Sequence, residues 1–178
     1  MLITSFSGIS PPELLKNKYK GFLDLLELHQ DIVLILKPRQ LNTVNDWLTI
    51  FPELNHWIKV GRVFVEDSDF TTQELIAYSD ILIAEDSSSV ILEAIHFDNL
   101  MIASLNVRYP YNELLRGLLF EDTNNLKLAI KDYIQTREPC SLALETKKII
   151  RKNFTMGLDE SSWSRVARDM AAYISTNP

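Results

Sequence analysis

Residues 79–94 read SDILIAEDSSSVILEA, and this stretch decides the fold. The apolar run from Ile81 to Ala84 is typical of a parallel strand that helices cover on both faces. Serines follow, and from Ser88 onward the apolar residues have helical spacing, with a serine at the favoured capping position. The stretch therefore predicts a strand, a short connection and a helix, which together are the building unit of an open parallel sheet.

The same alternation of strand-length apolar runs and helical patterns extends to both sides of this unit. It predicts an α/β fold, a Rossmann-like open parallel sheet of five to six strands with helices on both faces and extra C-terminal helices. We expect residues 1–178 to form a single Rossmann-like domain. The predicted strands are 2–6, 31–36, 58–65, 80–84 and 100–103, and the predicted helices are 10–29, 42–51, 71–78, 88–95, 111–116, 124–134, 142–152 and 161–174.

Charge and composition argue against several classes of function. Lys and Arg number 18 against 24 Asp and Glu, a net charge of −6, so nucleic acid is not an expected partner. The five glycines form neither a G-x-G-x-x-G loop nor a P-loop, which disfavours NAD-type dehydrogenases and P-loop NTPases. The single cysteine, Cys140, and three separated histidines offer no disulfide framework and no metal site. With no recognisable signal peptide or membrane helix, we expect a cytoplasmic protein with at most peripheral membrane association through the full-length protein.

The serine-rich connection is the best candidate for a ligand site. Ligands of open parallel sheets bind beyond the carboxyl ends of the strands, where helix amino ends point. Free N–H groups and the hydroxyls of Ser88 and Ser89 suit a phosphate there. Glu93 lies five residues after Ser88, ~7 Å along the helix axis, and a carboxylate at that distance can accept hydrogen bonds from the ribose of a nucleotide. A simpler interpretation stays open, in which a serine only caps the helix and Glu93 is solvated.

Basic residues follow two other predicted strands. Lys37 and Arg39 come after the second strand and are suitable partners for phosphate groups. Arg108 follows the fifth strand at the same edge and suits a sugar or a diphosphate. Each is also compatible with a surface residue that only closes a strand.

The spacing Asp-x-Ser-Ser-x-x-x-Glu-Ala after an apolar strand resembles the C-terminal nucleotide-binding domain of GT-B-fold transferases. CDP-glycerol glycerophosphotransferases and polysaccharide glycosyltransferases carry Asp-Tyr-Ser-Ser before this helix, and the related UDP-N-acetylglucosamine 2-epimerases carry Asp-Ser-Gly-Gly with a later Glu. Residues 35–39, ILKPR, are similar to the Lys-x-His-Pro of such domains, with Arg39 in place of the histidine. In this sequence the Asp-x-Ser-Ser-x-x-x-Glu spacing falls on Asp86, Ser88, Ser89 and Glu93.

The resemblance implies the donor-binding half of a glycosyltransferase or glycerophosphotransferase in cell-surface polysaccharide assembly. A UDP- or CDP-linked sugar or polyol donor is then the substrate, and neither a cofactor nor a metal is required. The chain begins at the first strand of such a half, so the acceptor domain and the catalytic base are expected elsewhere. We assign no catalytic residue and expect the isolated chain to bind without turnover.

Two alternatives remain open at this point. The chain can be a non-catalytic nucleotide-binding or scaffolding domain of the same fold, which the replacement of histidine by Arg39 favours. It can also be a small flavodoxin-like or receiver-type regulator. The regulator is disfavoured because no acidic pair follows the first strand and because the C-terminal helices make the chain long for that class.

Overall fold

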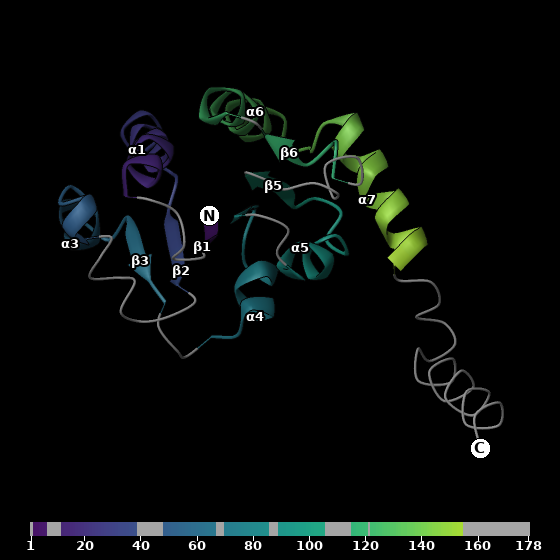
Figure 1. Cartoon of the computed structure of the whole chain (residues 1–178), viewed down its shortest axis with the longest axis horizontal. Helices are drawn as coiled ribbons and strands as arrows, with labels where there is room; N and C mark the ends of the chain where they lie inside the picture. Colours follow the sequence, from purple (N-terminus) through teal and green to yellow (C-terminus); the bar gives the residue numbers. More distant parts are fainter. Residues whose placement is uncertain are drawn as a thin grey trace, which may run out of the picture.

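A parallel sheet forms the centre of the chain (Figure 1). The structure is a computed structural model that describes residues 2–6, 12–38, 48–66, 70–85, 89–105, 115–120 and 122–154. The elements are β1 (Leu2–Phe6), α1 (Pro12–Leu28), β2 (Leu34–Pro38), α3 (Leu54–Lys59), β3 (Val63–Val65), α4 (Thr72–Ala77), β4 (Ile81–Glu85), α5 (Ser89–Ala94), β5 (Met101–Leu105), β6 (Leu119–Phe120), α6 (Thr123–Thr136) and α7 (Ser141–Phe154).

The strand order identifies where a ligand of such a sheet would bind. Within the described ranges the six strands are arranged β3-β2-β1-β4-β5-β6, and every neighbouring pair is parallel. Ile3 on β1 pairs with Ile35 on one side and with Leu82 on the other. The chain moves outward from β1 to β3 and then returns to β4, and ligands of Rossmann-like sheets bind at the carboxyl ends of the strands where the order reverses in this way. The predicted fold class is confirmed.

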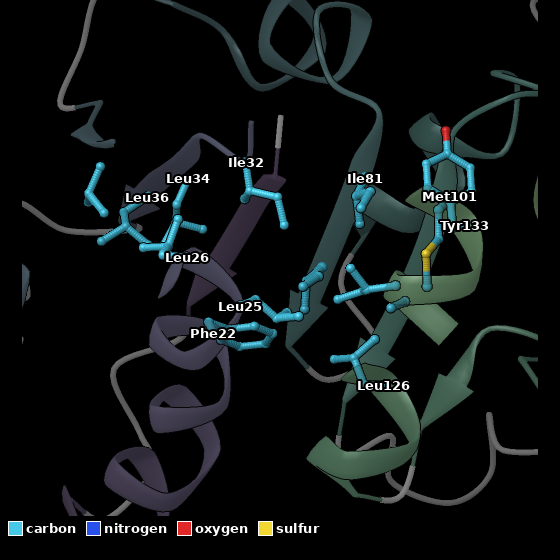
Figure 2. Packing of buried hydrophobic residues seen from close by; sticks show 14 of the residues in the cluster. Phe22, Leu25, Leu26, Ile32, Leu34, Leu36, Ile81, Met101, Leu126 and Tyr133 are labelled. Atoms are coloured by element: carbon cyan, nitrogen blue, oxygen red, sulfur yellow. The ribbon is translucent and has the colours of Figure 1, made fainter. Parts of the chain in front are cut away.

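Both faces of the sheet are buried, because successive side chains of a strand point to opposite faces and pack into two separate core clusters. One core cluster packs against α1 and α6, which lie side by side over one face (Figures 1 and 2). The other cluster includes residues of α4, α5 and α7. Because both faces are covered, the strands read in the sequence as continuous apolar runs. The first cluster contains the strand residues Leu34, Leu36, Ile81, Ile83, Met101 and Ala103, and the second contains Ile35, Leu82, Ala84 and Ile102.

The second strand starts at residue 34 rather than at 31 as predicted, and Pro38 is its last residue. Arg62 explains the late start. Its Nε donates to the carbonyl of Ile32 (2.8 Å), and its second guanidinium nitrogen donates to the carbonyls of Leu26 and His29. A side chain therefore satisfies the Ile32 carbonyl before the strand ladder begins, and Ile32 is buried as a residue of the preceding turn.

The predicted strand over 58–65 is wrong in its first half, because residues 54–59 form α3 and only 63–65 form β3. Leu54, Trp57 and Ile58 have helical spacing and all belong to, or pack against, the core that α1 and α6 cover. After the helix, Gly61 adopts a φ of 71°, which favours glycine, and its N–H donates to the carbonyl of Ile58 (3.1 Å). The apolar residues from 57 to 65 thus belong to a helix, a turn and a short strand.

Beyond β5 the predicted helices are confirmed in two of four cases. Helices α6 and α7 cover the predicted ranges 124–134 and 142–152. The predicted helix 111–116 is wrong in its described part, since residues 115–118 form a turn that leads into β6. Residues 111–114 and the predicted helix 161–174 lie outside the described residues, and of the predicted helix 42–51 the structure describes only 48–51, of which 48–50 are helical.

Gly117 lies where the turn before β6 meets α7. A Cβ atom at this position would lie 2.4 Å from the backbone oxygen of Leu142 and 2.4 Å from Oγ1 of Thr146. The Thr146 hydroxyl also accepts a hydrogen bond from the Gly117 N–H (3.1 Å). We expect Gly117→Ala to lower the free energy of unfolding by about 1–3 kcal/mol, because the backbone oxygen cannot move without shifting α7. Urea unfolding measures this loss.

A matched control for that measurement is Leu142→Ala, which removes a side chain from the same turn of α7. Leu142 is 46% exposed, so its loss should change the unfolding free energy by less than about 1 kcal/mol. A Gly117→Ala protein as stable as the parent would show that α7 does not press on the turn as closely as described.

Candidate functional site

Of the site residues that the sequence predicted, Lys37 lies near the carboxyl end of β2 and Glu93 lies on α5, the helix that follows β4. β4 ends at Glu85 and α5 begins at Ser89, which confirms the predicted strand and helix on either side of the serines. The structure describes the side chains of Lys37 and Glu93 and the backbone of Ser89. Four predicted site residues lie outside the described residues, namely Arg39, Asp86, Ser88 and Arg108.

Among the described residues, Glu93 is distinguished by a covered carboxylate oxygen. It follows Ser89 by four residues, about 6 Å along the axis of α5. Ile91 and Ala94 of the same helix are buried in the core, and Glu93 itself is half-buried. Its Oε2 atom is covered from solvent and makes no hydrogen bond in the part of the chain that the structure describes. Leaving such an oxygen without a donor costs about 1–3 kcal/mol or more, so this atom is not the solvated oxygen of the simpler interpretation.

The side chain of Lys37 is held by a hydrogen bond to the backbone and does not extend freely beyond the ends of the strands. Lys37 follows Ile35 by two positions on β2, so its side chain leaves the sheet on the face that α4 and α5 cover. Its Nζ donates a hydrogen bond to the carbonyl of Phe70 (2.9 Å). Lys37 therefore connects the end of β2 to the segment that follows β3.

That segment is also held by its own carboxylates. Oε1 of Glu66 accepts a hydrogen bond from the Phe70 N–H (3.2 Å). Thr71 caps α4 in a capping box with Glu74, which accepts from the Thr71 N–H (2.7 Å) and hydroxyl (2.8 Å). The backbone and side-chain hydrogen bonds from Thr71 hold the pKa of Glu74 below its ordinary value. The start of α4 is thereby fixed relative to β2 and β3.

The opposite edge of the sheet contains a polar cluster that the sequence analysis missed. In the turn between α5 and β5, the backbone carbonyls of residues 97–100 accept hydrogen bonds from side chains of α6 and α7. Lys147 on α7 donates to the carbonyls of Phe97 (2.8 Å), Asp98 (2.9 Å) and Leu100 (2.6 Å). The hydroxyl of Tyr133 on α6 donates to the carbonyl of Asn99 (2.6 Å), and burial together with the charge of Asp80 raises the pKa of that hydroxyl.

Lys147 and Arg151 join α7 to the carboxyl end of α5. Lys147 is only 1% exposed, and burial, together with the charge of Arg151, lowers its pKa from 10.5 to about 8, against the opposing effect of Asp98. Arg151 donates to the carbonyl of Ile95 and pairs with Asp98 (2.7 Å), which lowers the pKa of Asp98. A helical lysine or arginine normally reads as a surface residue, so no signal in the sequence reveals this cluster.

Two kinds of feature are absent from the part of the chain that the structure describes. There, no group of three or more His, Cys, Asp or Glu side chains is placed to hold a metal ion. None of the helices in these ranges is both long and apolar enough to cross a membrane. The cytoplasmic location stays a prediction.

Solved structures with the same fold include two proteins that bind nucleotides. One is the C-terminal CMP-Kdo binding domain of WaaA from Acinetobacter baumannii, with a TM-score of 0.56 and 16% identity over 84% of this chain and 88% of that chain. The other is the complex of S. aureus MnaA with UDP, with a TM-score of 0.53 and 18% identity over 84% of this chain. The match covers 43% of MnaA, so this chain spans less than half of that protein.

Comparison with family models and with curated proteins finds no match. Both structural neighbours are nonetheless described by a nucleotide ligand, CMP-Kdo for the WaaA domain and UDP for MnaA. At these identities the likeness is one of fold. The chain therefore shares the fold of these two nucleotide-binding structures, which is the kind of fold that the sequence predicted.

Proposed function

We propose that this chain binds the nucleotide of an activated sugar or polyol donor at the carboxyl edge of its sheet. The observation that carries the proposal is Oε2 of Glu93, which is covered and has no hydrogen-bond partner among the described residues, on the helix that follows β4 in a Rossmann-like sheet. A ribose hydroxyl is a donor of the right kind for this oxygen. The nucleotide ligands of the two neighbouring structures, CMP-Kdo and UDP, both contain a ribose and support the same assignment.

The diphosphate would then lie at the amino end of α5, near Ser88 and Ser89, and we propose Asp86, Arg39 and Arg108 as further contacts of the donor. Backbone N–H groups and positive charge at such a place stabilise a nucleotide diphosphate as it leaves. This chain would supply leaving-group stabilisation in a GT-B glycosyltransferase or glycerophosphotransferase of cell-surface polysaccharide assembly. An acceptor-binding half would supply the base and the acceptor.

Calorimetric titration of the chain with UDP, CDP, GDP and CMP tests this proposal. We expect saturable binding of at least one nucleotide. In a matched titration, inorganic pyrophosphate should bind much more weakly, because it has no ribose to contact Glu93. Binding of pyrophosphate as tight as that of the nucleotides would remove Glu93 from the site. If none of the ligands saturates, the scaffolding alternative replaces the donor-binding one.

A further inference from the structure

The backbone around Phe70 is held by side chains from three directions. Lys37 at the end of β2 donates to the Phe70 carbonyl, and Glu66 after β3 accepts from the Phe70 N–H. Glu74 on α4 accepts from the N–H of the next residue, Thr71. Every one of these bonds fixes main chain, and together they join two strands and a helix at the carboxyl edge of the sheet.

This network does not serve to bury Phe70, whose side chain remains 48% exposed. Holding a large apolar side chain at the surface gains little hydrophobic stabilisation. Fixing its backbone does lower the entropy that a ligand would otherwise lose in ordering the segment. Besides fixing the start of α4, the arrangement therefore holds an exposed apolar side chain in place at the carboxyl edge of the sheet, where a ligand can contact it.

We propose that Lys37 is a positioning residue of the nucleotide site, which acts by holding Phe70, and is not a phosphate ligand. This inference rests on the proposed function and refines it, because the sequence analysis paired Lys37 with phosphate. The Lys37 ammonium already donates to a backbone carbonyl 33 residues further along the chain. Its loss should therefore weaken binding by the same factor whatever number of phosphates the ligand carries.

The test uses Lys37→Met and compares a nucleoside monophosphate with the diphosphate of the same base, UMP with UDP or CMP with CDP. We expect an approximately fivefold loss of affinity for both ligands, in line with one charge-assisted hydrogen bond at a half-exposed place. Lys37→Arg, whose guanidinium can also donate to the carbonyl, should restore most of the affinity. Lys59→Met is the matched control, since it removes an exposed lysine at the end of α3 and should leave both affinities unchanged.

A double-mutant cycle with Phe70→Ala separates positioning from direct contact. In the Phe70→Ala background, Lys37→Met should weaken binding by less than twofold, because no side chain is left to position. A loss that is larger for the diphosphate than for the monophosphate, or that is equal in both backgrounds, would overturn the positioning role. If the parent chain binds no nucleotide at all, the proposed function fails, and the role of Lys37 at the site fails with it.

Discussion

Glu93→Gln is expected to weaken nucleoside diphosphate binding by roughly 10- to 100-fold while leaving the free protein at least as stable as the parent. In the free protein, Oε2 of Glu93 is covered and accepts no hydrogen bond from the described residues, which is an energetic cost. Glutamine removes the charged acceptor at that place, so the cost is reduced. The same change removes a charge-assisted hydrogen bond to the ribose, which is worth about 1.5–3 kcal/mol. Calorimetry for affinity and thermal unfolding for stability measure the two effects separately.

Deoxyribose ligands make the test of Glu93 specific. The parent protein should bind the 2′-deoxynucleotide or the 3′-deoxynucleotide less tightly than the ribonucleotide, and Glu93→Gln should lose most of this discrimination. Glu145→Gln is the matched control, because Glu145 is exposed on α7 and the same chemical change there should affect neither quantity. Equal discrimination in the parent and in Glu93→Gln would show that this carboxylate does not contact the sugar.

The order of strands and helices could be predicted from the sequence because both faces of the sheet are covered. Full coverage makes each strand a continuous apolar run, as at 81–84, and such runs are visible without any knowledge of tertiary structure. The boundaries that failed are those that distant contacts determine. Ile32 lies outside β2 because Arg62, 30 residues away, satisfies its carbonyl, and α3 forms where an apolar segment packs with helical spacing.

In the candidate site, too, local features could be predicted from the sequence and contacts between distant residues could not. The place of Glu93 on α5, one turn after Ser89, could be predicted because it depends only on the turns of one helix, and its contact with a ligand stays a prediction. The partner of Lys37 could not be predicted, since Phe70 reaches it only through the pairing of β2 with β3. The carbonyls that surround Lys147 are likewise brought together by the packing of α7 beside α5, and nothing near residue 147 in the sequence indicates them.

Lys147→Met is expected to lower the free energy of unfolding by about 2–4 kcal/mol. Methionine fills nearly the same volume, but the carbonyls of Phe97, Asp98 and Leu100 lose the ammonium that donates to them inside the protein. Each buried acceptor left without a donor costs about 1–3 kcal/mol, partly offset because the charge no longer has to be buried. For a chain of this size the midpoint of thermal unfolding should fall by about 5–12 °C. Lys148→Met, one residue further along α7 and exposed, should have almost no effect.

The difference in unfolding free energy between the parent and Lys147→Met should increase as the pH rises. Burial lowers the pKa of Lys147 to about 8 in the folded protein, from 10.5. Below about pH 8 both states carry the proton, and the folded state bears the cost of the buried charge. Between about 8 and 10.5 the unfolded chain binds more protons than the folded one, so the stability of the parent rises with pH relative to Lys147→Met, by at most about 1.4 kcal/mol per pH unit. Urea unfolding of both proteins from pH 7 to 10 measures this difference in unfolding free energy. A difference that stays constant from pH 7 to 10 would mean that the three carbonyls hold the folded pKa of Lys147 at or above its unfolded value and outweigh burial.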